Sequence, residues 1–358
     1  MRVAVALSGG VDSAVAALEL VEAGAEVVAL ALRLHDVEPD QPQAPRACCA
    51  PDDLLDARRV AEVLGIPFYV IDAREPFEGG VVRPFVESYL AGRTPNPCVG
   101  CNSFVKLGLL HRRARALGAA RLATGHYARV LRDLEGQPHL YRAVDGRKDQ
   151  SYFLFGTDRA VLSDLCFPLG ALAKDEVRAR ALEAGLPVAH KLDSQEVCFV
   201  GGAGAADYVR RRPEAAGLLD GSIVDESGRE LGRHQGLAGF TIGQRRGLGL
   251  GTHRRLFVLD IDGDSRTVIV GQEDRLRKTA LIARQPTWVG PAPSGPIRVE
   301  VKIRYRDPGA PALACLLEDG ALEVRFEREV RAIAPGQAAV LYRGDEVVGG
   351  GWIEEAIA

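Results

Sequence analysis

LSGGVDSAVAALEL, residues 7–20, joins a buried-strand pattern, VAVAL at 3–7, to a helical pattern, AVAALELVEAG at 14–24. Two adjacent glycines at such a junction let the backbone approach a phosphate closely. The N-terminus of the following helix offers free N–H groups and a dipole that favours an anion. Ser8 and Ser13 add hydroxyl donors. The stretch therefore predicts a phosphate-binding loop.

The loop differs from two common nucleotide-binding motifs. It has no Gly-Lys-[Ser/Thr], as a mononucleotide P-loop has, and no G-x-G-x-x-G, the Rossmann fingerprint. Asp12 would not bind a phosphate directly, but it could hold Mg²⁺ or order the loop. A tight strand–helix turn with a helix cap is the simpler alternative. The complete S-G-G-x-D-S pattern resembles instead the pyrophosphate (PP) loop of the N-type ATP pyrophosphatases, which implies cleavage of ATP to AMP and pyrophosphate.

Strand and helix patterns alternate through the first half of the chain, which favours a parallel α/β sheet. Further strand patterns are VVALAL at 27–32, PFYVID at 67–72 and RLATGH at 121–126. Helix patterns lie between them at 51–65, 80–91 and 104–117. We therefore expect a catalytic α/β domain over residues 1–205.

After about residue 205 the pattern changes to short alternating runs separated by Gly, Pro and Asp, which is typical of all-β domains. Examples are LFVLDID at 256–262, RTVIVG at 266–271, IRVEVKIRY at 297–305 and AAVLY at 338–342. The Pro-rich stretch QPTWVGPAPSGP at 285–296 is a candidate linker between two β modules. We expect two smaller, mainly-β domains over residues 206–280 and 281–358.

The composition narrows the class of protein. The chain has 358 residues, of which 47% are hydrophobic and 26% charged, as in ordinary globular proteins. A net charge of −3 does not point to a nucleic-acid partner, so a local basic surface would have to do so. The first residues lack the features of a secretion signal, and no apolar run is long enough for a transmembrane helix. Seven cysteines without such a signal predict reduced thiols in a cytoplasmic protein, with no membrane partner.

Further stretches identify a family within the ATP pyrophosphatases. They are TPNPCVGCN (94–102), ATGHYARV (123–130), KDQSYFLF (148–155), SQEVCFVG (194–201) and FTIGQRRGLGLG (240–251). Together, in this order and over essentially the whole chain, they resemble the tRNA-specific 2-thiouridylase family. The resemblance implies a PP-loop ATP pyrophosphatase domain, a small central β domain and a C-terminal β-barrel.

The resemblance also implies a reaction. ATP would adenylate the C2 oxygen of the wobble uridine of certain tRNAs, and a cysteine persulfide would then supply sulfur to C2 as AMP leaves. An amide-like carbonyl oxygen is a poor leaving group, and adenylation makes it a good one, while sulfur at the thiolate level is a strong nucleophile. The implied partners are tRNA and a sulfur donor, either a cysteine desulfurase or a sulfur-relay protein.

Residues are carried over from the family motifs position by position. ATP contacts are implied at Ala6, Leu7, Ser8, Gly9, Gly10, Val11, Asp12, Ser13, Leu32 and Gly125. Contacts with tRNA are implied at Asn96, Pro97, Cys98, His126, Lys148, Asp149, Gln150, Arg304, Tyr305 and Gln337. Leu32 would pack on adenine, although a place in the strand core explains it equally. Lys148 could also neutralise phosphate charge, and the Asp145-Gly146 pair predicts a hairpin turn between two strands in 139–155.

Two cysteines receive catalytic roles from the resemblance. Cys198 matches the cysteine that carries the persulfide, and Cys101 matches the second nucleophilic cysteine, which forms a disulfide with Cys198 when product is released. Cys98 departs from a well-known form of the family, in which an Asp at this position is proposed as general acid or base. A thiol with a pKa near 8.5 could replace that Asp only in part, so the proton-transfer role is open.

Metal-based alternatives remain for the same cysteines. Cys98, Cys101 and Cys198 could bind three irons of a [4Fe–4S] cluster and leave one iron open for sulfur. Cys48 and Cys49 could instead join Cys98 and Cys101 around zinc. Adjacent cysteines ligate one metal awkwardly, which counts against the zinc site.

The β half of the chain offers a candidate surface for RNA. No acidic residue occurs from Gly232 to Leu259, and this segment carries Arg245 and Arg246 among glycines. Glycine loops let backbone N–H groups and arginines reach a phosphate backbone. A small-molecule amidotransferase or ligase of the same superfamily is a rival function, but it would not need this basic half. A non-catalytic tRNA-binding protein is another, but it would not need the intact SGGVDS loop.

Overall fold

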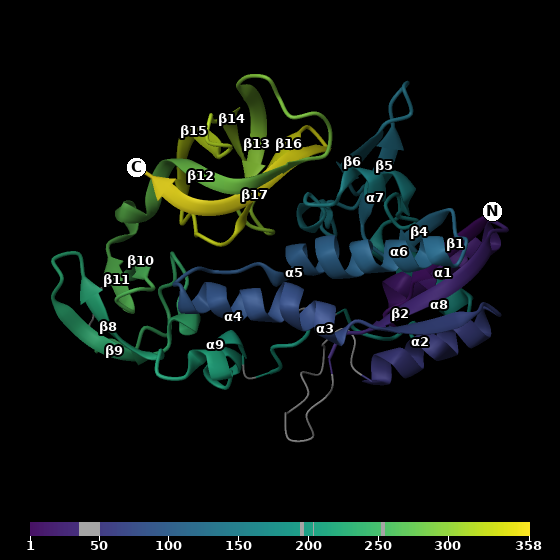
Figure 1. Ribbon diagram of the computed structural model, residues 1–358, viewed down its shortest axis with the longest axis horizontal. Helices are drawn as coiled ribbons and strands as arrows, with labels where there is room; N and C mark the ends of the chain where they lie inside the picture. Colours follow the sequence, from purple (N-terminus) through teal and green to yellow (C-terminus); the bar gives the residue numbers. More distant parts are fainter. Residues whose placement is uncertain (36–50, 194–196, 203, 252–254) are drawn as a thin grey trace. The chain divides into compact units, whose positions relative to one another are not determined.

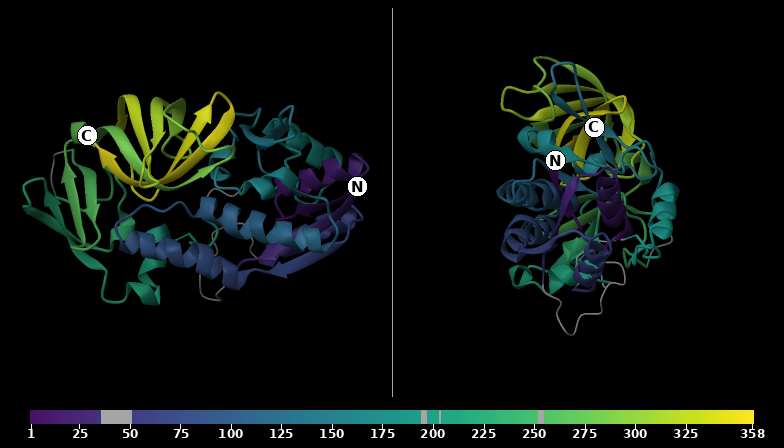
Figure 2. Two further views of the ribbon diagram at one scale, coloured as in Figure 1. Left: turned by 45° about the horizontal axis from the view of Figure 1, so that its top comes forward. Right: turned by 90° about the vertical axis from the view of Figure 1, so that its right-hand side faces the viewer.

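The computed structural model describes residues 1–35, 51–193, 197–202, 204–251 and 255–358. Cys48, Cys49 and the first three residues of the SQEVCFVG motif lie outside the described residues. The chain forms two compact units (Figures 1 and 2). Unit one comprises Met1–Val81, Cys98–Gly202 and Asp345–Val348, and unit two comprises Val82–Pro97, Ala203–Gly344 and Gly349–Ala358.

A five-stranded parallel sheet forms the centre of unit one. Its strand order is β3-β2-β1-β4-β7. The strands are β1 (Arg2–Ala6), β2 (Glu26–Arg33), β3 (Phe68–Asp72), β4 (Arg121–Thr124) and β7 (Leu165–Cys166). The chain crosses from β3 to β4 on the other side of β1, so the topology reverses between β1 and β4. In open α/β sheets ligands bind at the carboxyl ends of the strands at such a reversal, and the SGGVDS loop begins there.

Helices cover both faces of this sheet (Figure 2, right). α1 (Val11–Glu22) packs on β1, β2 and β4, and α8 (Lys174–Glu183) packs on α1. α2 (Pro51–Val63) packs on β2, and α6 (Gly108–Ala116) packs on β1 and β4. The core is built from β1 side chains Val3 and Val5 and from Val15 of α1, all of which are fully buried. The parallel sheet predicted from alternating strands and helices is confirmed.

Two of the expected helices are longer than predicted and contain π turns. The first runs through α3 (Arg74–Phe77), a π segment (Glu78–Val82) and α4 (Arg83–Leu90). The second runs through α5 (Pro97–Gly100), a π segment (Cys101–Leu107) and α6. Pro97 occupies the first helical position, where its missing N–H is harmless, so the helix begins seven residues before the predicted start. Cys101 therefore opens a π segment, a feature that occurs frequently at functional sites.

The hairpin predicted around Asp145-Gly146 is wrong. The hairpin of this region pairs β5 (Ala128–Arg132) with β6 (Pro138–Arg142), one strand earlier. After β6 the Asp149 carboxylate accepts hydrogen bonds from the backbone N–H groups of Ala143 and Ser151, which closes a compact turn. A 3₁₀ turn (Ser151–Phe153) follows in place of the second strand. The sequence correctly indicated a turn. Within residues 139–155, all of which the structure describes, no second strand pairs after it, because the Asp149 side chain accepts backbone N–H groups that a strand ladder would otherwise use.

Unit two contains a four-stranded sheet with the order β10-β11-β8-β9. Its strands are β8 (Asp220–Asp225), β9 (Glu230–Gln235), β10 (Phe257–Asp262) and β11 (Thr267–Gly271). Ile223, Val258, Val268 and Val270 form its buried core. Shorter elements of the two units are α7 (Arg159–Asp164), α9 (Gly204–Arg210) and the 3₁₀ turns Pro213–Ala215, Leu237–Gly239 and Glu273–Leu276.

The C-terminal strands of unit two close into a barrel. The order is β12-β15-β14-β13-β16-β17, and β12 also pairs with β17. The strands are β12 (Arg277–Trp288), β13 (Ile297–Lys302), β14 (Ala310–Leu316), β15 (Leu322–Arg331), β16 (Ala338–Arg343) and β17 (Glu346–Ile357). β17 also pairs with β6 at Glu346 and Tyr141, so the sheet continues from the barrel into the β6–β5 hairpin.

Two predictions for this region are corrected. The segment 285–296 does not link two β modules, because its first four residues belong to β12 and the rest connects β12 to β13 within the same barrel. The strand predicted at 297–305 ends at Lys302, and the following residues bend before β14 begins. Among the described residues, no helix is both long and apolar enough to span a bilayer.

Candidate active site

The SGGVDS loop has the geometry that the sequence predicts. The Leu7 N–H donates to the Leu30 oxygen at 2.9 Å, which extends the β1–β2 pairing to the start of the loop. Gly9 has φ of +76°, and a Cβ at this position would lie 2.1 Å from the Asp53 carbonyl oxygen. Any other residue would therefore be strained and would collide with the backbone at Asp53.

Ser13 ties the loop together from within. Its Oγ lies 3.1 Å from the Ser8 backbone nitrogen, 3.2 Å from Ser8 Oγ and 3.0 Å from the Gly10 oxygen. Gly10 is the N-cap of α1 and has no side chain that could cap the helix. The first N–H groups of α1 thus remain available to an anionic ligand.

Gly125 supports the loop from the neighbouring strand. A Cβ at Gly125 would lie 2.7 Å from both the Asp12 carbonyl carbon and the Ser13 nitrogen. The residue after β4 must therefore be glycine for the backbone to touch the start of α1. Ala6 ends β1 and Val11 starts α1, while Leu32 lies in β2 with 8% of its surface exposed.

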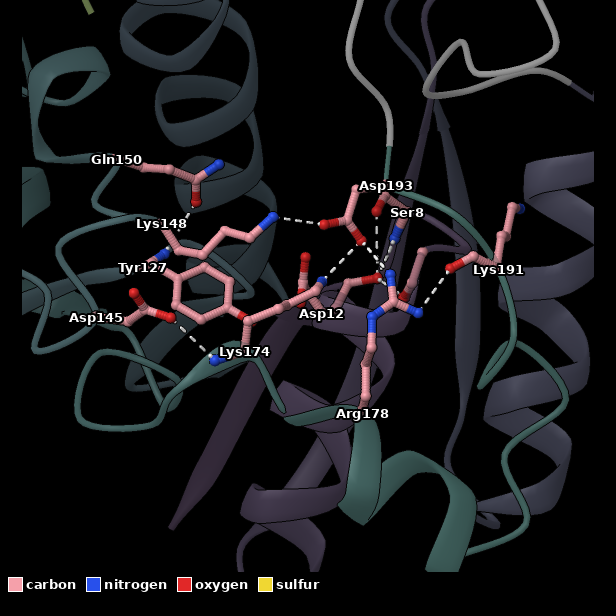
Figure 3. A network of polar contacts seen from close by, with 12 residues as sticks. Ser8, Asp12, Tyr127, Asp145, Lys148, Gln150, Lys174, Arg178, Lys191 and Asp193 are labelled. Atoms are coloured by element: carbon pink, nitrogen blue, oxygen red, sulfur yellow. Dashed lines mark hydrogen bonds and ion pairs between the residues drawn. The ribbon is translucent and has the colours of Figure 1, made fainter. Parts of the chain in front are cut away.

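A lysine from α8 reaches the carboxylate of the loop (Figure 3). Lys174 Nζ lies 2.6 Å from Asp12 Oδ1 and 2.8 Å from Asp193 Oδ1, with only 7% of its side chain exposed. The Tyr127 hydroxyl donates to the same Asp12 oxygen at 2.8 Å. Burial, together with the nearby Asp12 carboxylate, raises the pKa of Tyr127, so the phenol keeps its proton.

Asp193 gathers three cations beside the loop (Figure 3). Its carboxylate lies 2.7 Å from Lys148 Nζ and 2.8 Å from Arg178 Nη2, in addition to Lys174. Burial acts to raise the pKa of Asp193, but the hydrogen bonds from Lys148 and Lys174 outweigh it and lower the pKa to about 2. Asp193 is therefore fully ionised at neutral pH.

Lys191 joins the loop to α2. Its Nζ lies 3.0 Å from the Gly9 oxygen, 2.5 Å from Asp53 Oδ1 and 2.7 Å from Asp56 Oδ2. Burial acts to lower the pKa of Lys191, but the bonds to Asp53 and Asp56 outweigh it and raise the pKa. Around the loop, four cations thus face four carboxylates. The cations are Lys148, Lys174, Arg178 and Lys191, and the carboxylates are Asp12, Asp53, Asp56 and Asp193.

His126 follows Gly125 and is held neutral. Burial and the positive charge of Lys106, in the π segment that Cys101 opens, lower the pKa of His126 to about 3. Thr124 Oγ1 lies 2.8 Å from His126 Nδ1, and the same oxygen accepts the His126 backbone N–H at 3.4 Å. Thr124 is buried, and its hydroxyl donates to Nδ1 or accepts from it according to the ring tautomer. In either tautomer a neutral His126 carries one ring N–H donor.

The three residues of the predicted tRNA segment 148–150 have different surroundings. Lys148 reaches Asp193. Asp149 is buried and accepts the two backbone bonds described above and also the Ser151 hydroxyl at 3.0 Å. The Gln150 side chain accepts the Tyr127 N–H at 2.9 Å, and the Gln150 N–H donates to the Tyr127 oxygen at 2.8 Å. Gln150 and Lys148 thus connect the segment to the Asp12 network.

The three cysteines of interest differ in exposure. Cys101 is buried, Cys98 is exposed, and Cys198 is half-buried in a turn in which the Val200 N–H donates to the Val197 oxygen. Phe199, beside Cys198, packs edge-on against Phe77. In the described part of the chain no three His, Cys, Asp or Glu side chains are grouped as ligands of a metal ion would be. The [4Fe–4S] alternative for the three cysteines stays a prediction, and the zinc alternative with Cys48 and Cys49 lies outside the described residues.

Unit two brings together other residues predicted to meet tRNA. Gln337 Nε2 donates to the oxygens of Thr94 and Pro95 at 3.0 and 3.3 Å, just before Asn96 and Pro97. The Thr94 N–H donates to the Pro335 oxygen at 2.8 Å, and the Thr94 hydroxyl lies 3.5 Å from that of Thr241. The barrel thus fixes the start of TPNPCVGCN.

The predicted arginines lie on the surface of unit two. Arg245 and Arg246 are exposed in the glycine-rich loop that follows Thr241. Arg304 is exposed and lies 3.7 Å from Asp307, and Lys302 lies 6.0 Å from the Tyr305 ring centre.

Several residues of the site were missed in the sequence. They are Tyr127, Lys174, Arg178, Lys191 and Asp193. Lys174 is 162 positions from Asp12, and no local pattern links them. Tyr127 lies within the quoted stretch ATGHYARV and Asp193 directly precedes SQEVCFVG, so these two stretches were the one available signal.

Comparison with known proteins places the chain in a family. Residues 1–202 match a family model described as a tRNA methyl transferase HUP domain. Residues 207–272 match a tRNA methyl transferase PRC-barrel domain, and residues 278–353 an aminomethyltransferase β-barrel domain. A curated protein of Geotalea uraniireducens, named tRNA-specific 2-thiouridylase MnmA, is 47% identical over 99% of this chain and 96% of its own length. The chain belongs to the tRNA-specific 2-thiouridylase family.

Other members of the 2-thiouridylase family match to a similar extent. A protein of Geobacter metallireducens with the same name is 46% identical over 99% of this chain and 97% of its own. A protein of Sorangium cellulosum with the same name is 48% identical over 99% of this chain and 93% of its own length. The family fold, a parallel-sheet HUP domain followed by a PRC-barrel domain and a closed C-terminal barrel, agrees with the sheets described above.

Proposed function

We propose that this protein is an ATP-dependent tRNA sulfurtransferase that converts the wobble uridine of tRNA to 2-thiouridine in the cytoplasm. The observation that carries the proposal is the intact SGGVDS loop, whose helix N-terminus and neighbouring Lys174 can receive a triphosphate, in a member of the 2-thiouridylase family. The descriptions of the family models mention methyl transfer. A loop that binds and cleaves ATP favours activation by adenylation, which methyl transfer from a sulfonium donor would not require.

In the first step the loop residues Ala6–Ser13 and Gly125 would hold ATP. The N–H groups of the first turn of α1 and the Lys174 ammonium would bind phosphate oxygens. Leu32 would pack on adenine. Mg²⁺ accompanying ATP would be held mainly by phosphate oxygens and water, as is usual for this ion. The C2 oxygen of uridine attacks the α-phosphorus, pyrophosphate leaves, and the base becomes an adenylate.

In the second step the terminal sulfur of a Cys198 persulfide attacks C2, and AMP leaves. Cys101 thiolate then attacks the Cys198 sulfur, so the C2-bound sulfur departs as 2-thiouridine and a Cys101–Cys198 disulfide remains. A cellular thiol must reduce this disulfide before the next cycle. The persulfide would come from a cysteine desulfurase or a sulfur-relay protein.

Binding of tRNA would use both units. Asn96, Pro97, Cys98, His126 and the segment 148–150 would lie near the target base, while Arg245, Arg246, Arg304, Tyr305 and Gln337 would lie along the tRNA. Neutral His126 is suited to donate to a carbonyl oxygen of a base. Gln337 would act by holding the segment that leads to Asn96.

A deletion strain tests the proposal. Nucleosides from its tRNA are separated and identified by mass spectrometry. The proposal predicts that 2-thiouridine derivatives disappear and that the wild-type gene restores them, while Cys198→Ser does not. Loss of a methylated nucleoside with 2-thiouridine unchanged would contradict it and favour methyl transfer.

A further inference from the structure

One carboxylate beside the ATP loop holds three cations at once. Asp193 binds Lys148, Lys174 and Arg178 at 2.7, 2.8 and 2.8 Å. About four-fifths of its side chain is buried, since 19% is exposed. This number of ion pairs exceeds what a single negative charge needs for neutralisation.

The three cations come from two different parts of unit one. Lys174 and Arg178 are one turn apart on α8, so their side chains leave the same face of the helix. Lys148 comes from the turn after β6. Asp193 thus fixes the position of the Lys148 turn relative to α8, as Figure 3 shows. Lys174 in turn reaches the loop through Asp12.

The cations of this network are already paired without a ligand. The four cations and the four carboxylates named above are equal in number, so each cation faces a carboxylate before a polyphosphate binds. The phosphates of ATP carry several negative charges and offer the same kind of oxygen acceptor as a carboxylate. An anion in this place must therefore compete with Asp193 for the same ammonium and guanidinium groups.

We propose that Asp193 is an exchangeable counter-ion of the ATP site, which holds Lys148, Lys174 and Arg178 in position and gives them up to phosphate oxygens when ATP binds. The inference rests on the proposed ATP-dependent function. Asp193 acts through the three cations, so it is a positioning residue. Its low pKa means that the exchange occurs with an ionised carboxylate over the whole physiological range.

Two other roles for Asp193 predict different behaviour. A permanent anchor would keep its ion pairs in the ATP complex, and removing it would disorder the cations and weaken ATP binding. A magnesium ligand would strengthen binding of Mg·ATP but not of free ATP. An exchangeable counter-ion competes with ATP, so removing its charge strengthens binding of both forms.

Isothermal titration calorimetry of the full-length protein with ATP, with and without Mg²⁺, separates these roles. Asp193→Asn keeps the shape and removes the charge, and we expect its Kd for ATP to fall roughly fivefold or more in both conditions. Asp319→Asn is the matched control, because Asp319 pairs with Arg284 in the C-terminal barrel, and its Kd should equal that of wild type. In thiolation assays Asp193→Asn should lower KM for ATP.

The outcomes are distinguishable from each other. If wild type binds ATP and Asp193→Asn binds it equally or more weakly, the inference about Asp193 is overturned. The proposed function is then unaffected, because wild type still binds ATP. Absence of ATP binding by wild type overturns both. Asp193→Ser is measured in parallel, and thermal unfolding without ATP identifies a variant that does not fold. If only one variant folds, the Kd of that variant decides.

Discussion

Lys174 Nζ lies 2.6 Å from Asp12 Oδ1, although the two residues are 162 positions apart in the sequence. This bond connects the N-terminus of α8 to the N-terminus of α1, which follows the phosphate loop. Asp12 therefore orders the loop by accepting from Lys174 and Tyr127. The proposed role of Lys174 is to stay near the loop until the phosphates of ATP arrive.

Lys174→Met should weaken ATP binding by roughly ten- to a hundredfold, because a charge-assisted bond to phosphate is lost. It also leaves Asp12 without its cation, so the free energy of unfolding should fall by about 1–3 kcal/mol. Calorimetry and urea denaturation measure the two effects. In a double-mutant cycle with Asp12→Asn, a coupling energy near zero would contradict the direct interaction.

Neutral His126 should make stability depend on pH in a defined direction. Its pKa is about 3 in the folded protein, against 6.5 for an unperturbed histidine. Between these two pH values the unfolded chain binds more protons than the folded protein. The free energy of unfolding therefore falls as the pH drops below about 6.5, by up to about 1.4 kcal/mol per pH unit. Urea denaturation from pH 7 to pH 4 should show a shallower fall for His126→Gln than for wild type.

His139 provides a control of opposite sign for the His126 measurement. Hydrogen bonding to Glu346 and then to Asp133 raises the pKa of His139. The contribution of His139 to the free energy of unfolding is therefore fully present below about pH 6.5, and it is lost as the pH rises through the pKa of His139 in the folded protein. His139→Gln should therefore lower stability at acidic pH more than at pH 8. Equal pH profiles for wild type and His126→Gln would exclude a buried neutral His126.

Arg245→Glu combined with Arg246→Glu should weaken tRNA binding roughly tenfold or more at low salt and reduce its salt dependence. Both arginines are exposed, so the fold and ATP binding should be unaffected. Arg211→Glu with Arg229→Glu makes the same charge change at exposed arginines outside this loop. Filter binding at several salt concentrations compares the pairs, and equal tRNA affinities would remove this loop from the tRNA surface.

Gln337→Ala removes the two hydrogen bonds that hold Thr94 and Pro95. We expect a loss of about 1 kcal/mol of stability, faster amide exchange at Thr94 and a severalfold higher KM for tRNA, with KM for ATP unchanged. Gln272→Ala makes the same substitution at an exposed position of unit two and is the matched control. A KM for tRNA equal to that of wild type would show that the anchor is not needed for RNA binding.

Local sequence patterns predicted the part of the site that consecutive residues build. The parallel sheet followed from strand and helix periodicity. The SGGVDS loop followed from its adjacent glycines, and Gly9 adopts the positive φ of +76° that favours glycine. The cation network could not be predicted, because Lys174, Asp193 and Asp12 meet only after folding. The hairpin at Asp145 failed for a related reason, since Asp149 satisfies backbone donors that a strand ladder would otherwise use. The assignment of Cys101 and Cys198 came from the family resemblance and remains a prediction.

The proposed function requires that one chain couples ATP cleavage to sulfur transfer onto uridine. A single-turnover reaction tests it most directly, with purified protein persulfidated by a cysteine desulfurase, an unmodified tRNA transcript and ATP, and with AMP and 2-thiouridine measured together. We expect that AMP and 2-thiouridine form in equal amounts, that Cys198→Ser abolishes 2-thiouridine, and that Cys101→Ser stops product release. Formation of 2-thiouridine without AMP, or of AMP without 2-thiouridine in the wild-type protein, would contradict it.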